Sequence, residues 1–238
     1  MPFDAAIYSR LIWVFVIVFT ALMPLICLLL LVKRSVEEEE YQSRVFSNQV
    51  IEGMETERQR IVLELHDMVL PLVNDAAVSE RIRSICNELI PPDFARLSLS
   101  DSLRSLCAQF TKRTGIECVC SIEESLDFSF LGAEKQLHLY RIVQEALTNI
   151  KKHSGAEKAV VIARQSDQGN GNILICVSDD GRGLTQDAQD GANRQPSAAE
   201  GIGMKTMKQR AAIVGADLQF IGEEGNGLTV RVEISNEQ

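Results

Sequence analysis

The feature that most constrains this chain is an apolar run near its N-terminus, over residues 11–32, which contains no charged side chain. As an α-helix at ~1.5 Å per residue the run spans ~33 Å, enough for a bilayer core of ~30 Å. Lys33-Arg34 follows directly and is typical of a stop-transfer pair, whereas no small-residue cleavage site of a signal peptide follows. We therefore expect 1–34 to hold one transmembrane helix. Because Lys33-Arg34 outnumber Arg10 on the other side of the run, we expect the remainder of the chain to lie in the cytoplasm.

The chain as a whole has an acidic composition. The formal net charge is -9, and Lys and Arg never form a run longer than two, which argues against direct binding of nucleic acid. The six cysteines show no metal-ligand spacing. We interpret them as small buried hydrophobes in a reducing cytosol, with a redox sensor as the alternative.

A helical stripe of apolar residues follows the membrane segment. Positions at alternating steps of three and four are Ile51, Met54, Arg58, Ile61, Leu65, Met68 and Leu72. Apart from Arg58 this is the a/d pattern of a coiled coil or bundle, and valines beside it widen the stripe. A second helix is expected over 78–90, where Pro91-Pro92 ends it. Because one hairpin cannot bury so wide a face, we expect 35–95 to form the four-helix bundle of a homodimer.

His66 lies at the edge of this stripe. It follows the core position Leu65 and is therefore rotated by ~100° to the rim of the apolar face. A neutral imidazole is a competent nucleophile toward phosphorus, and a carboxylate on its other ring nitrogen would fix the tautomer. Asp67 is the candidate carboxylate, although neighbours in a helix do not face each other and the contact needs a favourable rotamer. A boundary histidine on its own is more often structural, so a catalytic role for His66 requires an ATP site elsewhere in the chain.

Residues 96–238 predict an α+β sandwich, in which one helical layer packs on one mostly antiparallel sheet. The expected helices are 103–113, 133–152 and 204–214, and the expected strands are 116–122, 158–164, 172–178, 218–221 and 229–234.

Residues suited to binding phosphate and a metal share one face of the expected helix 133–152. Glu145, Asn149 and Lys152 recur at i, i+4 and i+7, with His153 as an alternative to Lys152. The amide oxygen of Asn149 can ligate Mg²⁺, which prefers hard oxygen donors. A cationic side chain one turn later can meet a phosphate group.

Two glycine-containing segments complete an expected ATP site. Asp179 ends a strand and can accept a hydrogen bond from the adenine amino group, while Gly181 and Gly183 leave room for the base. Residues 185–200 are polar and lack an apolar period, as expected for a mobile lid. Gly201-Ile-Gly203 then opens a helix whose N-terminal amides suit phosphate. Each signal is weak alone, but their order and spacing favour a nucleotide site.

At these motifs the chain resembles sensor histidine kinases of the nitrate-sensor and DesK-like class, which act on response regulators with LuxR-type DNA-binding domains. The resemblance covers about residues 55–234 and is strongest in ERQRIVLELHD, YRIVQEALTNIKKHSGA, VSDDGRGL and GIGMKTMKQRA. It implies a dimerising hairpin followed by a GHKL-type (Bergerat) ATPase domain, with ATP and Mg²⁺ as cofactors. It also implies a single-pass protein of the bacterial cytoplasmic (inner) membrane whose kinase domain lies in the cytoplasm.

The resemblance also implies a role for each motif residue. His66 would be the phospho-acceptor and Asp67 its acid–base partner, while Asn149 would ligate Mg²⁺, Lys152 would contact phosphate and Asp179 would read adenine. The glycines that would frame the lid are Gly181, Gly183, Gly201 and Gly203.

The chain departs from the pattern of this class at three points. Pro71 replaces a glutamine that positions water for dephosphorylating the regulator, and we expect it to loosen the helix one turn beyond His66. The hairpin from His66 to Pro91 is short, and Leu228 stands where threonine is usual, so that Thr229 is the candidate substitute. Two other functions stay open: a GHKL ATPase or serine kinase of the anti-sigma type, and a membrane adaptor that binds ATP without transferring phosphate.

Overall fold

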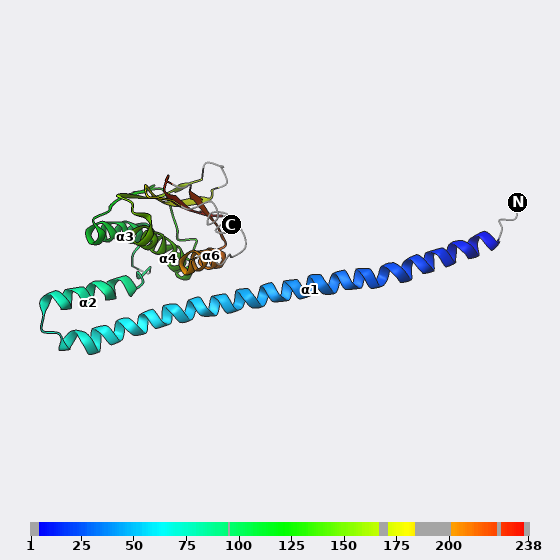
Figure 1. Cartoon of the computed structure of the whole chain (residues 1–238), viewed down its shortest axis with the longest axis horizontal. Coiled ribbons are helices and arrows are strands. Elements are labelled where there is room, and N and C mark those ends of the chain that lie inside the picture. The colour runs from blue at the N-terminus through cyan, green and yellow to red at the C-terminus, as the bar shows by residue number, and fades with distance from the viewer. Residues whose placement is uncertain (1–4, 95, 167–170, 184–200, 223–224, 236–238) are drawn as a thin grey trace. The chain divides into compact units, whose positions relative to one another are not determined.

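The computed structural model describes residues 5–94, 96–166, 171–183, 201–222 and 225–235 (Figure 1). The chain divides into two units, Met1–Val50 and Ile51–Gln238. The apolar N-terminal run belongs to the first unit. The helical hairpin and the predicted α+β sandwich belong to the second.

The apolar run lies in α1, Ala5–Glu64, which is one continuous helix with Pro24 inside it. Trp13–Ser35 is long and apolar enough to cross a membrane, with a mean hydropathy of 3.0 and none of it buried. Within this stretch the Thr20 hydroxyl donates to the Val16 carbonyl at 2.8 Å, so the helix itself satisfies this polar group. The predicted span over 11–32 therefore coincides with a candidate membrane helix, which continues past Lys33-Arg34 without a break.

The helical turn that contains His66 is not α-helical. After Glu64 the chain forms a π-helix, η1, Leu65–Val69, and then a 3-10 helix, η2, Leu70–Leu72. Pro71 accounts for this change, because it lacks an N–H and its ring clashes with the carbonyl four residues back. The Leu70 N–H donates instead to the Leu65 carbonyl. The expected loosening one turn beyond His66 is seen in η2, but the departure from the α-helix begins earlier, in the turn that carries His66 itself.

The return helix of the hairpin, α2, runs over Ala76–Leu89. It begins two residues before the expected start because the Asp75 carboxylate caps it, accepting the Ala77 and Val78 N–H groups at 2.7 and 3.2 Å. It ends where Ile90 becomes extended ahead of Pro91, as the residue before a proline usually does.

A five-stranded sheet forms the body of the second unit. Its strands are β1 Glu117–Ile122, β2 Lys158–Gln165, β3 Ile173–Asp179, β4 Ala216–Gly222 and β5 Leu228–Ile234. The strand order is β1-β2-β3-β5-β4, with β1 and β2 parallel and the other pairs antiparallel. The prediction of a mostly antiparallel sheet is confirmed.

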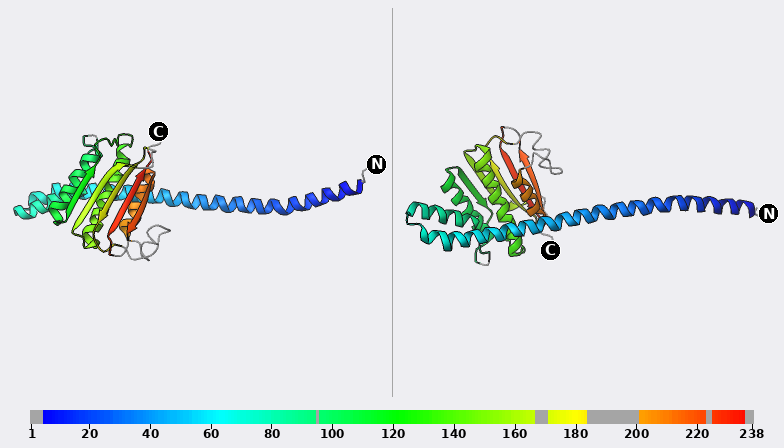
Figure 2. Two further views of the ribbon diagram at one scale, coloured as in Figure 1. Left: turned by 90° about the horizontal axis from the view of Figure 1, so that it is seen from above. Right: turned by 60° about the horizontal axis from the view of Figure 1, so that its bottom comes forward.

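Helices cover one face of this sheet (Figure 2). They are α3 Leu99–Thr114, α4 Ala133–Asn149 with its π-helical continuation η3 Ile150–Ser154, and α6 Ile202–Val214. On β2, alternate residues Ala159, Val161 and Ala163 are buried in the core shared with the helices. One helical layer on one sheet was predicted, and the arrangement places the ends of α4, α6 and β3 together.

Candidate nucleotide-binding site

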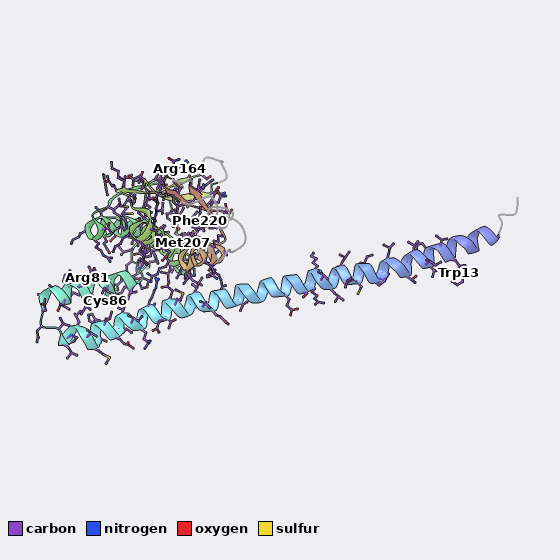
Figure 3. The ribbon with its side chains drawn as sticks, viewed as in Figure 1. Trp13, Arg81, Cys86, Arg164, Met207 and Phe220 are labelled. Atoms are coloured by element: carbon purple, nitrogen blue, oxygen red, sulfur yellow. The ribbon has the colours of Figure 1, made fainter. Side chains whose placement is uncertain are left out.

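A cavity of about 470 Å³ lies among α4, α6 and the end of β3. Its apolar wall is built by Val177, Met207, Phe220, Leu228 and Val230. Met207 and Phe220, labelled in Figure 3, are 1% and 0% exposed and belong to the core as well as to the wall. Such a wall suits a flat base, whereas the polar groups around the rest of the cavity suit phosphates.

The α4 side of the cavity carries the predicted acidic, amide and cationic side chains. Glu145 and Asn149 lie one turn apart on α4, and both line the cavity. Lys152 and His153 follow in η3, so they do not continue the regular α-helical spacing. Both nevertheless line the cavity, so each remains a candidate for the phosphate contact.

Asp179 enters the cavity from the end of β3. Burial raises the pKa of its carboxyl above the usual value, and hydrogen bonds from the Gly181 and Leu228 N–H groups oppose this shift. The Gly181 N–H donates to Asp179 Oδ1 at 2.9 Å. The backbone thus holds the carboxylate at the apolar end of the cavity, where it can accept a hydrogen bond from a base.

Two of the predicted glycines allow close approach of neighbouring groups. A Cβ at Gly203 would collide with the Glu145 carboxylate, so the N-terminus of α6 packs directly on the α4 face that carries Asn149. A Cβ at Gly181 would lie 2.5 Å from the Ser154 carbonyl oxygen and 2.7 Å from Asp179 Oδ1. The backbone contact requires glycine at Gly181, whereas at Gly203 the obstacle is the end of the Glu145 side chain, which would have to move.

Most predicted nucleotide-binding residues reach the cavity, including Gly183, Gly201 and Gly203. Gly181 does not line it and instead supports Asp179. Thr229 does not line it either: its Oγ1 lies 2.8 Å from Ser178 Oγ on the neighbouring strand, and Leu228 takes the position on the wall. The expectation that Thr229 contacts nucleotide is therefore not supported. The expected lid, 185–200, lies outside the described residues.

The donor groups fit a magnesium ion that is held mainly by nucleotide phosphates. Asn149 offers an amide oxygen and Glu145 a carboxylate one turn earlier, and both line the cavity. The described part of the chain contains no group of three or more His, Cys, Asp or Glu able to hold a metal. Mg²⁺ commonly binds through one or two protein oxygens, substrate phosphates and retained waters, so this sparse set is sufficient.

The predicted pair of His66 and Asp67 does form. His66 Nδ1 lies 2.8 Å from Asp67 Oδ1, so the side chains adopt the rotamers that the contact between adjacent residues requires. Both side chains are exposed, at 68% and 69%. The pair is therefore accessible to solvent. Neither residue lines the nucleotide cavity, so the pair is separate from the nucleotide site.

A buried charge cluster beside the cavity was not anticipated. Glu55 of α1 contacts Arg141 of α4 and Arg210 of α6, and both arginines are 2% exposed. Burial disfavours the charged form of Glu55, but the two guanidinium groups outweigh it and lower the pKa of the carboxyl. The sequence did offer one sign of this cluster. Both arginines occupy positions that the helical periodicity of α4 and α6 assigns to the buried core.

The second half of the chain matches a known family. Residues 134–238 match the family of histidine kinase-, DNA gyrase B- and HSP90-like ATPases. This part of the chain is therefore similar to the ATPase domains of that family, in agreement with the α+β fold and the cavity. Among known structures, the histidine kinase domain of the Erythrobacter litoralis EL346 blue-light activated histidine kinase superposes with a TM-score of 0.50 at 20% identity, covering 76% of this chain and 93% of that one.

Curated relatives extend the similarity toward the hairpin. Sensor histidine kinase MctS of Rhizobium johnstonii is 32% identical over 199 residues, which cover 71% of this chain and 41% of MctS. Sensor histidine kinase LiaS of Bacillus subtilis is 27% identical over 232 residues, covering 85% of this chain and 59% of LiaS. The chain thus spans about half the length of these relatives.

Proposed function

We propose that the chain is a membrane-anchored sensor histidine kinase that transfers the γ-phosphoryl group of ATP to its own His66, and from there to an aspartate of a response regulator. The observation that carries this proposal is the presence, in one chain, of an exposed His66–Asp67 pair and a nucleotide-sized cavity. A GHKL ATPase that phosphorylates serine, or one that only binds ATP, has no need of the pair.

His66 acts as the nucleophile in this reaction. A neutral imidazole carries one N–H, and when Nδ1 donates it to Asp67 the lone pair lies on Nε2. Nε2 attacks the γ-phosphorus, the N–P bond forms, and the bond from phosphorus to the bridging oxygen of ADP breaks. The imidazole becomes positively charged as this happens, and the carboxylate of Asp67 stabilises that charge.

The residues around the cavity bind and orient ATP. Asp179 accepts a hydrogen bond from the adenine amino group against the apolar wall, and Lys152 or His153 contacts a phosphate. Asn149 holds Mg²⁺, which neutralises charge on the phosphates when bound. The N-terminal amides of α6, starting at Gly201 and Gly203, are available to the phosphate chain.

A homodimer is part of the proposal because the hairpin leaves apolar side chains uncovered. Met68 and Leu72, both on the predicted stripe, are 67% and 81% exposed. A second copy that packs against the same stripe would complete a four-helix bundle and remove this surface from water.

The finer assignments rest on the motifs. We place the protein in the nitrate-sensor and DesK-like class, with a LuxR-type response regulator as partner and no direct contact of its own with nucleic acid. Trp13–Ser35 would anchor it as a single span in the bacterial cytoplasmic membrane, with the ATPase domain in the cytoplasm.

The test is labelling of the full chain, reconstituted in lipid nanodiscs, with ATP that carries a labelled γ-phosphate. Acid-labile, base-stable label on the wild type is expected, together with its loss in His66→Gln at unchanged nucleotide affinity. Acid-stable label would indicate a serine kinase, and nucleotide binding without label would indicate an adaptor. Label on His138 or His153 in His66→Gln would assign the acceptor to another residue.

A further inference from the structure

Three cysteines of the α+β domain gather where α3 packs against β1, a strand at the edge of the sheet. Cys107 lies on α3 and is 1% exposed, whereas Cys118 and Cys120 lie on β1 and are half-buried. Residues two apart on a strand point to the same side, and both β1 cysteines pack against the core that contains Cys107. Helix and strand therefore bring three thiols together.

Two hydrogen bonds fix how α3 lies along β1. Arg104 Nη2 donates to the Ile122 carbonyl at 3.1 Å, and the Cys118 N–H donates to Thr111 Oγ1 at 3.0 Å. The helix rises ~10.5 Å between the two α3 residues, and the strand covers ~13 Å between the two β1 residues, so the two stretches match in length. Helix and strand therefore run past each other in opposite directions over this stretch.

This arrangement places Cys107 opposite Cys120. Cys107 lies ~4.5 Å along the helix from Arg104, and Cys120 lies ~6.6 Å along the strand from Ile122. The Cys107 thiol is in hydrogen-bonding contact with Cys120 and also with Cys118, and it is the donor to both. Thiols in contact can be joined as a disulfide with little movement of the backbone. The two β1 cysteines are less suited to each other, because ~6.6 Å along one strand is near the upper limit for a disulfide.

Cys120 is the thiol best suited to react. The hydrogen bond from Cys107 is the main cause that lowers the pKa of Cys120 to about 7; burial opposes the shift and the Arg104 guanidinium adds to it. The hydrogen bonds to its two neighbours, together with burial, raise the pKa of Cys107, which stays a neutral thiol. Oxidation favours an accessible thiolate that has a second thiol beside it. The described residues form no metal-binding group of three, so oxidation is the chemistry that these thiols support.

We propose that Cys120 and Cys107 form a site of thiol oxidation, at which a hydroperoxide closes a disulfide between β1 and α3. The Cys120 thiolate attacks the peroxide: an S–O bond forms, the O–O bond breaks, and the leaving oxygen takes a proton and departs as water or an alcohol. The Cys107 thiol then attacks the sulfenic sulfur, the S–S bond forms, and the hydroxyl group leaves as water with the thiol proton. The peroxide gains two electrons, and the two thiols lose them.

The site is separate from the nucleotide cavity. No residue of α3 or β1, both of which the structure describes in full, lines that cavity. The proposal therefore does not depend on the proposed kinase function. ATP affinity should be the same in the reduced and the oxidised chain.

The experiment treats the reduced full chain in nanodiscs with hydrogen peroxide at neutral pH, and follows each cysteine by alkylation and peptide mapping. Cys176 is the internal control, because it is also half-buried but burial raises its pKa, and its strand neighbours are Ile162 and Arg231. We expect Cys120 to be oxidised at least about tenfold faster than Cys176, since an ordinary thiol is mostly protonated at this pH. Maps made without reductant should contain the Cys107–Cys120 crosslink, and reductant should remove it.

Variants separate the roles of the two cysteines. Cys107→Ala should leave a sulfenic acid on Cys120, which dimedone traps, because the second thiol is gone. Cys120→Ser should abolish the crosslink, and Cys176→Ser should match the wild type. If Cys107→Ala fails to fold because the residue is buried, Cys120→Ser at its half-buried position still tests the proposal.

Three outcomes would overturn it. Equal rates of oxidation at Cys120 and Cys176 would show that the contact with Cys107 confers no reactivity. A crosslink between Cys107 and Cys118 that persists in Cys120→Ser would assign the reactive thiol to the wrong residue of β1. A large loss of ATP affinity on oxidation would contradict a site that is separate from the cavity.

Discussion

The ATPase domain and the hairpin differ in how far they bury their apolar residues. In the domain, Leu103, Ile142 and Phe220 are 0% exposed and belong to one continuous core. In the hairpin, Met68 and Leu72 are 67% and 81% exposed. Both segments show regular apolar patterns in the sequence, so the pattern alone does not say what buries it. The domain thus completes its own core, whereas the hairpin leaves the apolar surface that the proposed homodimer would cover.

The two regions share one local feature at their predicted functional residues. His66 lies in the π-helix η1, and Lys152 and His153 lie in the π-helix η3. Different signals end the α-helix in each case: Pro71 follows the first, and Gly155, with φ of 67°, caps the second. Single π-turns within helices are frequent at functional sites, because they re-aim side chains that a regular helix would fix.

The largest expected effect concerns the hairpin. Asp67→Asn should slow phosphorylation of His66 by ~10²–10⁴-fold, the usual contribution of a positioned acid–base group, because an amide cannot stabilise the imidazolium as a carboxylate does. Nucleotide affinity should stay unchanged, since Asp67 lies outside the cavity. Glu64→Gln is the matched control, a nearby exposed carboxylate paired with Arg60. Equal rates for Asp67→Asn and wild type, measured by labelling, would reduce Asp67 to a surface residue.

The second prediction tests whether the ATPase domain completes its own hydrophobic core. Phe220→Ala should lower the free energy of unfolding by about 3–5 kcal/mol, because it leaves a cavity in a packed core. The adjacent Ile221→Ala is the control, since Ile221 is 47% exposed on the other side of β4, and a change below about 1 kcal/mol is expected. Chemical denaturation measures both. Similar losses for the two variants would contradict a core that the domain completes alone.

The third prediction concerns the contribution of Asp179 to the affinity for ATP. Asp179→Asn should weaken ATP binding by about 10–100-fold, because the amide presents an NH₂ group where adenine needs an acceptor. Since burial raises the pKa of this carboxyl, wild-type affinity should fall on acidification from a higher pH than for an ordinary aspartate. Asn149→Asp should alter the Mg²⁺ dependence instead. Calorimetry that finds wild-type binding of Mg-ATP in both variants would place the site elsewhere.

A smaller effect is expected from the exposed apolar stripe. Leu72→Ser should weaken self-association by about 1–3 kcal/mol per buried side chain while leaving unfolding of the ATPase domain unchanged. Leu97→Ser, at an exposed leucine outside the hairpin, is the control. Fluorescence transfer between labelled copies in nanodiscs measures association. A variant that associates like wild type would show that Leu72 does not belong to a dimer interface.

Local patterns predicted the layers of the fold well, because periodicity and chain breakers act over short distances. The strands and α4 begin within two residues of expectation, and Pro91 and Gly115 end their helices as expected. The start of α3 at Leu99 was missed by four residues, since the signal was the Ser98 cap, whose Oγ accepts the Asp101 N–H at 3.0 Å.

Long-range contacts could not be predicted in the same way. The sequence showed that Asn149 and Asp179 carry side chains suited to a nucleotide site, and the family pattern gave their order. Both residues do line the cavity. Nothing local connects Glu55 to Arg210, which are 155 residues apart and meet only because α1 packs across α4 and α6. The π-turns were also missed, since a helix that widens by one residue keeps nearly the same apolar pattern.

Pro71 gives the last and smallest expected effect. It lies in η2, directly after the turn that carries His66, and it has no amide side chain to orient water on a phosphorylated regulator. We therefore predict that the full chain accelerates loss of phosphate from its regulator by less than about twofold, since a general-base contribution of even ~10²-fold would require a positioned group there. The assay mixes purified phosphorylated regulator with the chain and ADP, and follows the acyl phosphate. Pro71→Ala should behave like wild type, whereas Pro71→Gln tests whether an amide at this position adds activity. Strong acceleration by the wild type that persists in Pro71→Ala would show that another hairpin residue positions the water.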